Sequence, residues 1–216
     1  GDAAGEFIVS ESNEDAVALV RRWRAWPGGA MALYGPHGSG KTHLLKSWAE
    51  EAEAAFLDPN AGASEVQTVF EAHGGRVAVD NIDGPRDDAA MMALLDLARD
   101  RGGAVLVTGT APPGEWPVVL LDLRSRFSGM LAARLGDPDL TLLQAVIRRL
   151  CRRRFIELRE NVAKYIAENG ERSFEAAQAV VDELDRMMTE GRNPVAYDLA
   201  GEALKRVARR REGEGQ

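Results

Sequence analysis

Residues 35–44 read Gly35-Pro36-His37-Gly38-Ser39-Gly40-Lys41-Thr42-His43-Leu44 and fit the pattern G-x-x-x-x-G-K-[ST] of a phosphate-binding loop. An apolar run, Ala30 to Tyr34, precedes this loop, and a helical pattern, Leu44 to Ala54, follows it. Glycines let successive backbone N–H groups point at phosphate oxygens, and the following helix adds the positive end of its dipole. The stretch therefore predicts a strand, loop and helix that together bind a nucleoside diphosphate or triphosphate.

Two further positions complete the predicted chemistry of this loop. Lys41 is expected to reach the β- and γ-phosphates, and the Thr42 hydroxyl is expected to bind Mg²⁺. The apolar strand Val77 to Val79 ends in Asp80, and such an aspartate holds Mg²⁺ directly or through water. Asn81 follows, where an ATPase usually has a glutamate that activates water. A neutral amide orients water but cannot take its proton, so we predict slow hydrolysis by this chain itself.

Charge is unevenly distributed along the 216 residues, whose net charge is −7. Residues 1–140 carry 21 acidic and 12 basic side chains, net −9, and residues 141–216 carry 13 and 15, net +2. The acidic balance argues against free-standing, sequence-independent DNA binding, so direct DNA contact is expected to be weak or indirect. A single cysteine, Cys151, excludes an internal disulfide and suits a reducing cytosol. Neither a membrane-spanning run nor a signal-peptide pattern is found, which predicts a cytoplasmic protein without a membrane partner.

Strand-like and helix-like runs alternate from residue 30 to about 136. Strands are predicted at 31–34, 55–57, 77–80, 104–108 and 130–135, and helices at 41–54, 63–72 and 87–101. This alternation predicts an α/β domain, residues 1–138, with a parallel five-stranded sheet covered by helices on both faces.

Beyond Pro138 the pattern is helical throughout. Helices are predicted at 139–155, 159–169, 173–190 and 195–210, with Asn193-Pro194 separating the last two. Residues 139–216 are therefore expected to form an all-helical subdomain, with a charged tail that frays from Arg209 to Gln216.

Two more segments carry candidate catalytic residues. The strand Ala104 to Thr108 runs into Thr110, whose hydroxyl would contact the γ-phosphate or its attacking water. The segment Leu123 to Phe127 follows a proline-rich loop and is expected to form an exposed turn before the last strand. From that turn Arg126 would reach the nucleotide of a neighbouring subunit, and an ordinary surface arginine is the alternative.

Together these segments resemble the bacterial replication-initiator family of AAA+ proteins, which includes the initiator DnaA and its regulator Hda. The likeness runs nearly end to end. In chain order it covers the opening motif at Phe7 to Asn13, Walker A at Gly35 to Leu45, Walker B at Val77 to Ile82, sensor 1 at Val107 to Pro113, the arginine-finger box at Leu123 to Phe127 and the Hda lid helix at Glu183 to Arg186.

The resemblance implies an AAA+ P-loop NTPase with a C-terminal helical lid. Such a protein would bind ADP or ATP together with Mg²⁺. The implied nucleotide-binding residues are Phe7, Ile8, Val9, Asn13, Gly35, Pro36, His37, Gly38, Ser39, Gly40, Lys41, Thr42, His43 and Arg172. Thr42 and Asp80 would hold the metal, and Asp80, Asn81, Thr110 and Arg126 would be catalytic, with Arg126 as an arginine finger acting in trans.

The sequence departs from the family pattern at two site positions. Thr110 stands where sensor 1 usually has aspartate. Aligning on Leu184 to Arg186 puts Glu175 where the family has the sensor 2 arginine, and Arg172, about one turn earlier, is the candidate replacement. The initiator continues into a helix-turn-helix DNA-binding domain, whereas this chain stops after the lid, which favours the Hda type.

By resemblance, the expected activity is to bind the DNA-loaded sliding clamp and to stimulate hydrolysis of ATP on DnaA, which limits replication initiation. This would place the protein at the replisome on the bacterial nucleoid, and it leaves homo-oligomerisation open. The family's clamp-binding peptide is not found, and we expect it upstream of Gly1. The alternatives are an autonomous ATPase, such as a helicase loader or another remodeller of replication complexes, and a P-loop kinase acting on a small molecule.

A basic helical face remains outside this assignment. Arg148, Arg149, Arg152 and Arg153 fall at i, i+1, i+4 and i+5 of a predicted helix. The face would contact DNA beside the clamp or an acidic partner. The alternative, which we favour, is that it is a solvated face of the lid.

Overall fold

The computed structural model describes residues 7–189 and 195–214, which fall into two compact units. One unit comprises Gly1–Phe7 and Asn13–Gly136, and the other comprises Ile8–Ser12 and Asp137–Gln216. The chain passes from the first unit to the second after Gly136, two residues before the predicted boundary at residue 138. No helix in the described ranges has the length and apolarity needed to cross a membrane.

The first unit is built on a parallel five-stranded sheet. The strands are β1 (Ala30–Tyr34), β2 (Ala55–Phe56), β3 (Arg76–Val79), β4 (Ala104–Gly109) and β5 (Leu131–Arg134), in the order β2-β3-β4-β1-β5. The helices are α1 (Glu14–Arg21), α2 (Lys41–Ala52), α3 (Ala63–Ala72), α4 (Asp88–Arg101) and α5 (Leu121–Ser128), with short 3₁₀ turns η1 (Trp23–Ala25), η2 (Pro27–Gly29) and η3 (Pro113–Glu115). The parallel α/β fold predicted from the sequence is confirmed.

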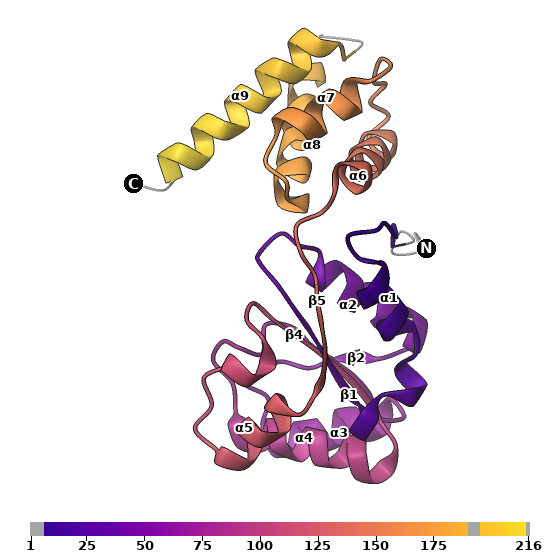
Figure 1. The fold of residues 1–216 in the computed structure, drawn as a ribbon, viewed down its shortest axis with the longest axis vertical. Coiled ribbons are helices and arrows are strands. Elements are labelled where there is room, and N and C mark those ends of the chain that lie inside the picture. The colour runs from indigo at the N-terminus through magenta and orange to yellow at the C-terminus, as the bar shows by residue number, and fades with distance from the viewer. Residues whose placement is uncertain (1–6, 190–194, 215–216) are drawn as a thin grey trace. The chain divides into compact units, whose positions relative to one another are not determined.

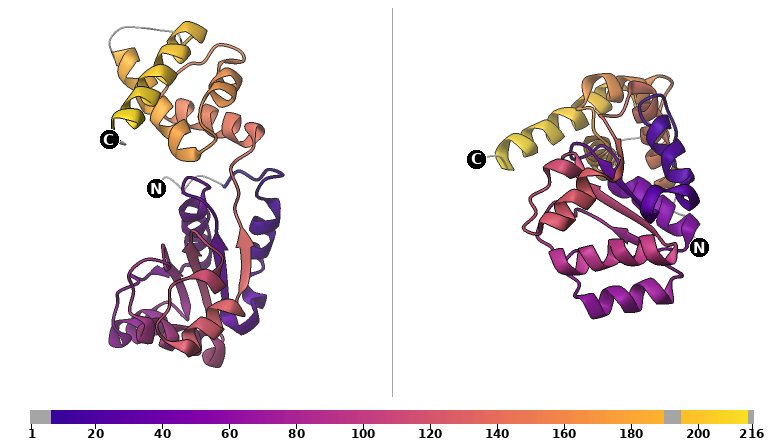
Figure 2. Two further views of the ribbon diagram at one scale, coloured as in Figure 1. Left: turned by 60° about the vertical axis from the view of Figure 1, so that its left-hand side comes forward. Right: turned by 60° about the horizontal axis from the view of Figure 1, so that its bottom comes forward.

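Two hydrophobic cores sandwich this sheet, because side chains alternate between the faces of each strand. On β4, Val105 and Val107 join the core beneath α3, α4 and α5, whereas Leu106 joins the core beneath α1 and α2. All three side chains are fully buried, and each stabilises the fold by about 1.5–3 kcal/mol relative to exposure. Figures 1 and 2 show α1 and α2 on one face of the sheet and α3 and α4 on the other.

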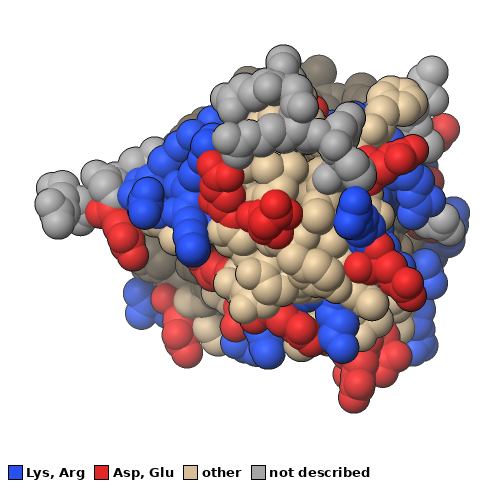
Figure 3. Space-filling model, turned by 90° about the horizontal axis from the view of Figure 1, so that it is seen from above, with Lys and Arg blue, Asp and Glu red and all other residues tan. Residues whose placement is uncertain are grey.

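The second unit is helical. It contains α6 (Leu140–Arg153), α7 (Val162–Asn169), α8 (Phe174–Thr189) and α9 (Tyr197–Glu214), packed around one apolar core. The Asp139 carboxylate accepts a hydrogen bond of 2.7 Å from the Leu142 N–H and so caps the start of α6. Basic side chains gather along α9, at the left of Figure 3.

One predicted boundary of this unit differs from the structure, and another cannot be compared with it. Residues 209–214 of the predicted frayed tail are helical, because α9 continues to Glu214. The Arg211 guanidinium pairs with Glu171, which ties the last turns of α9 to the connection between α7 and α8. Asn193 and Pro194 lie outside the described residues.

Candidate nucleotide-binding site

The phosphate-binding loop connects the carboxyl end of β1 to the first residue of α2. Gly35, Gly38 and Gly40 have φ values of +150°, +75° and +94°, a region that side chains rarely adopt. A Cβ atom on Gly35 would lie 1.9 Å from the Leu135 carbonyl oxygen, because the loop starts directly against the chain that follows β5. The backbone path therefore requires glycine at Gly35.

We expect Gly35→Ala to lower the free energy of unfolding by roughly 2–5 kcal/mol, through this clash and the strained φ. Gly28→Ala is the matched control, since Gly28 also has a positive φ, +63°, but its added Cβ would meet nothing within 4 Å. The control should cost only about 1 kcal/mol. Thermal and denaturant unfolding of both variants measure the difference, and equal losses would contradict the argument.

Lys41 is held inside the loop. Its Nζ atom donates hydrogen bonds of 2.7 Å to the carbonyl oxygens of Gly35 and Pro36. Burial lowers the pKa of the Lys41 ammonium below its ordinary value, against the opposing effect of the Asp83 and Asp80 charges. Ser39 is buried as well, and its Oγ atom has no hydrogen-bond partner among the described residues. A buried cation and an orphaned hydroxyl at one place favour an anionic ligand that would satisfy both.

The start of α2 adds backbone donors to this loop. The first helical hydrogen bond runs from the Leu44 N–H to the Gly40 carbonyl, at 2.9 Å. The N–H groups of Lys41 and Thr42 precede that bond, so α2 itself offers them no acceptor. Donors at the positive end of a helix dipole, beside a buried lysine, are the chemistry that binds phosphate groups. The residues present therefore fit a nucleotide's phosphates.

The predicted metal ligands lie together. The Thr42 hydroxyl, at the start of α2, donates a hydrogen bond of 2.9 Å to Asp80 Oδ2, just beyond β3. The Thr108 hydroxyl, on β4, donates to the other carboxylate oxygen of Asp80. Carboxylate and hydroxyl oxygens are the hard ligands that Mg²⁺ prefers, alongside water and substrate phosphates. The pair Thr42 and Asp80 thus fits a Mg²⁺ site.

Asn81 takes a left-handed backbone conformation, φ +54°, and its side chain is exposed. Its N–H donates to the Thr108 hydroxyl at 2.9 Å. The Thr108 oxygen therefore links the backbone after β3 to the Asp80 carboxylate. Thr108 was not among the residues predicted for the site, although its position one residue before the end of an apolar strand was visible in the sequence.

Thr110 faces a loop aspartate, and its contact with the γ-phosphate stays a prediction. Its N–H and its hydroxyl both donate to Asp83 Oδ2, at 2.6 and 2.5 Å, so it faces this loop aspartate, and the hydroxyl that contacts Asp80 is that of Thr108. Burial acts to raise the pKa of Asp83, but hydrogen bonds from Thr110 and from the backbone of Asp83 and Ala111 together outweigh it and hold the pKa below its ordinary value. Asp83, which the sequence analysis did not assign to the site, is electrostatically coupled to Lys41.

The remaining predicted binding residues divide between the two units. Phe7 is buried and its ring stacks on that of His43, with centroids 5.4 Å apart, while Asn13 is buried at the start of α1. Pro36 and His37 are exposed in the loop. Ile8, Val9 and the exposed Arg172 belong to the second unit. The phosphate-binding loop and the predicted metal ligands all belong to the first unit.

Arg126 is not on a turn. Leu123 and Phe127 are one helical turn apart and fully buried, so the segment forms helix α5 with Arg126 half-buried in its last turn. The Arg126 guanidinium donates a hydrogen bond of 2.7 Å to Asp96 of α4, and Asp96 also pairs with Arg99 at 3.1 Å.

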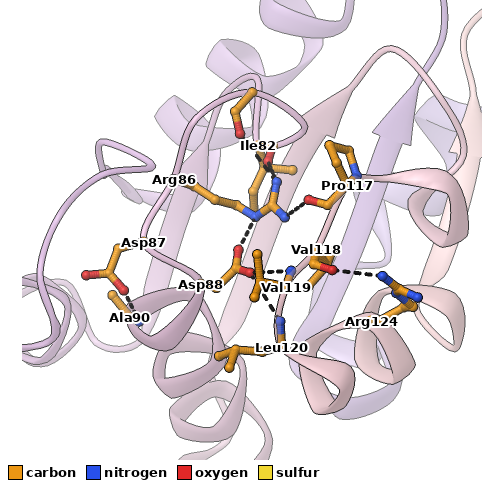
Figure 4. A network of polar contacts seen from close by, with 11 residues as sticks. Ile82, Arg86, Asp87, Asp88, Ala90, Pro117, Val118, Val119, Leu120 and Arg124 are labelled. Carbon is orange, nitrogen blue, oxygen red and sulfur yellow. Dashed lines mark hydrogen bonds and ion pairs between the residues drawn. The ribbon is translucent and has the colours of Figure 1, made fainter.

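A network of polar contacts fixes the loop that leads into α5 (Figure 4). The Arg86 guanidinium pairs with Asp88 at 2.8 Å and donates to the carbonyl oxygens of Ile82 and Pro117. The Asp88 carboxylate accepts from the Val119 N–H at 2.9 Å, and Arg124 donates to the Val118 carbonyl. These contacts hold the start of α5 in register with α4, so the position of Arg126 is set by side chains far apart in the sequence.

No protein-family model matches the chain. The chain is 29% identical to the replication factor C large subunit of Aeropyrum pernix, over 93% of this chain and 44% of that protein. It is 25% identical to the chromosomal replication initiator protein DnaA of Symbiobacterium thermophilum, over 93% of this chain and 49% of that protein. The chain therefore spans about half the length of the curated relatives it matches.

Solved structures show the same fold. Domain III of the Thermotoga maritima replication initiation protein DnaA superimposes with a TM-score of 0.74 and 19% identity, covering 93% of this chain and 94% of that chain. AMPPCP-bound DnaA from Aquifex aeolicus gives a TM-score of 0.64 and 18% identity over 88% of this chain and 66% of that chain. The fold is thus the AAA+ fold, and the sequence matches support a relationship to AAA+ replication proteins, DnaA among them.

Proposed function

We propose that this chain is a regulatory AAA+ module of the Hda type, which binds adenine nucleotide and, with the DNA-loaded sliding clamp, promotes hydrolysis of ATP on DnaA. One observation carries this proposal. The first unit has the groups that hold a nucleotide, yet an amide stands at Asn81, where a hydrolysing site has a carboxylate.

The binding groups support a nucleotide ligand. Buried Lys41, the orphaned Ser39 hydroxyl and the start of α2 form a cradle for phosphates. Thr42 and Asp80, whose oxygens are 2.9 Å apart, would hold Mg²⁺, which when bound would neutralise phosphate charge. The AMPPCP bound to a DnaA of the same fold favours an adenine nucleotide.

The nearby residues make poor bases. Asn81 has no proton-accepting carboxylate, and its N–H is engaged by Thr108. Asp83, whose charge acts on Lys41, is an alternative base, but Thr110 donates to it twice, and a carboxylate whose pKa is lowered is a weak proton acceptor. We therefore expect slow hydrolysis by the chain itself, with its catalytic contribution made to a partner's nucleotide.

Arg126 is the group proposed to act on that partner. A guanidinium supplied by a neighbouring subunit stabilises the charge that develops as phosphoryl transfer proceeds. The similarity to DnaA, 25% over 93% of this chain, supports DnaA as the neighbour.

The second candidate is an AAA+ ATPase that loads or remodels another replication complex. The similarity to the replication factor C large subunit, at 29% identity, favours it. This candidate requires turnover of ATP by the chain itself, which the regulatory module does not.

The deciding experiment measures hydrolysis of radiolabelled ATP prebound to DnaA, with DNA-loaded clamp, with and without this protein. Stimulation that requires both the clamp and the protein supports the proposal. A parallel assay of the protein alone, with DNA and with ATP, tests the second candidate. Turnover by the protein alone, without an effect on DnaA, would replace the proposal by the second candidate.

A further inference from the structure

Helix α6 ends in a hydrogen-bonded motif that normally contains glycine. The Ile156 N–H donates to the Cys151 carbonyl at 2.9 Å, and the Phe155 N–H donates to the Arg152 carbonyl at 3.1 Å. This pair of bonds is the Schellman motif, whose first residue past the cap adopts a left-handed conformation and is usually glycine. Here that residue is Phe155, with φ +56°.

Packing explains Ile156 but not Phe155. Ile156 is buried in the core of the helical unit beside Cys151, as the motif requires. The Phe155 side chain, in contrast, is 91% exposed. A strained backbone and an exposed ring are both unfavourable, and glycine at this position would avoid both. The stability of the fold therefore gives no reason for an aromatic ring here.

The sequence on either side of Phe155 is strongly basic. Residues 148–159 contain six arginines and one acidic residue. Arg148 and Arg152 lie one turn apart on α6 and, with Arg159 beyond the helix, line a cavity of about 530 Å³. Arg154 is engaged otherwise, because its guanidinium pairs with Asp182 at 2.5 Å.

Other residues that line the cavity limit the kinds of ligand and reaction expected there. Cys151 forms part of its wall, but burial raises the pKa of the Cys151 thiol to about 11, so the thiol is not a nucleophile at neutral pH. Glu157 and Glu160 also line the cavity and would repel phosphate there. Phosphate groups of a ligand are therefore expected to contact Arg148 and Arg152 of α6 and to avoid the carboxylates of Glu157 and Glu160.

We propose that Phe155, Arg148 and Arg152 form a binding site for single-stranded nucleic acid on the helical unit. An unpaired base would stack on the Phe155 ring, and neighbouring phosphates would contact the two guanidinium groups. Proteins commonly bind single-stranded nucleic acid with exposed aromatic rings, which stack on bases, and with basic side chains, which contact the phosphate backbone. A duplex keeps its base faces stacked, and an acidic peptide would use the arginines without needing the ring.

This site is separate from the nucleotide site, and its local charge differs from the net charge of −7 that argues against DNA binding by the whole chain. All of the negative excess is in residues 1–140, net −9, whereas residues 141–216 are net +2 and contain the proposed site in a locally basic segment. Binding should accordingly be local, of modest affinity and steeply dependent on salt.

The test is fluorescence anisotropy of a labelled oligothymidylate, titrated with the full chain at low salt. Phe155→Gly should weaken binding roughly 5- to 150-fold, because one stacked base is lost. Arg152→Gln should weaken binding and reduce the slope of log K against log salt by about 0.7, the value for one phosphate contact. Arg209→Gln, which removes an exposed arginine of α9, is the matched control and should change neither.

Stability measurements keep the test independent of folding. Phe155→Gly should melt at the same or a higher temperature than the parent, since glycine suits the left-handed position. The proposal would be overturned by no binding of the parent at low salt, by equal losses in Arg209→Gln and Arg152→Gln, or by full affinity in Phe155→Gly. Displacement of the oligonucleotide by polyglutamate at equal charge concentration would also overturn it, in favour of an acidic protein ligand.

Discussion

Replacing Arg126 with alanine is expected to lower the stimulation of DnaA-bound ATP hydrolysis by about 10³-fold or more, while leaving nucleotide binding by this chain unchanged. An arginine finger is worth roughly 10³–10⁵ in rate where it acts. Single-turnover hydrolysis of ATP on DnaA measures the first effect, and calorimetric titration of the variant with ADP measures the second.

The ion pair between Arg126 and Asp96 does not prevent this role. Their side chains are 31% and 38% exposed, and exposed pairs contribute only about 0–1 kcal/mol. A 10³-fold rate effect corresponds to about 4 kcal/mol, so engagement of the transition state outweighs loss of the pair.

Arg99→Ala is the control for this variant, because it also removes a partner of Asp96 but lies on α4. It should leave stimulation within about twofold of the parent, as expected for a surface pair worth a fraction of a kcal/mol. If Arg126→Ala instead loses its own ADP affinity, Arg126 serves the local site and the trans assignment fails.

Replacing Lys41 with alanine should weaken binding of both ADP and ATP by roughly 10- to 150-fold, because a charged hydrogen-bond donor to phosphate is lost. The ligand-free protein should lose little stability or gain some, since burial of the Lys41 ammonium is itself unfavourable. The variant should therefore retain its melting temperature but lose the rise that nucleotide and Mg²⁺ produce in the parent. At a hundredfold excess over Kd that rise reflects about 2.7 kcal/mol of stabilisation.

Lys46→Ala is the matched control, because Lys46 lies on the same helix, five positions later, with an exposed side chain. Calorimetry and thermal shift on the two variants separate the site from a general effect of charge. Equal losses of nucleotide affinity in both variants, or unchanged affinity in Lys41→Ala, would contradict the proposed role of Lys41 in binding phosphate.

Local sequence determined the sheet, the phosphate-binding loop and the helical second unit. The order of residues from Ala30 to Leu44 specifies strand, glycine loop and helix, because backbone freedom and apolar periodicity are properties of neighbouring residues. The same holds for Asp80, which ends an apolar strand, and for α3, which spans Ala63–Ala72 as predicted.

Only the tertiary structure decided which side chains meet. Thr108 contacts Asp80, the charge of Asp83 acts on Lys41, and Arg126 pairs with Asp96. The two residues of each pair are at least 28 positions apart in the sequence, and the fold brings them together. The segment around Arg126 is a helix because Leu123 and Phe127 are buried against the core, and periodicity over so short a span did not reveal it. The exposure of Phe155 likewise depends on where α6 ends and on what packs beside it, since burial is set by the whole unit and not by the residue type.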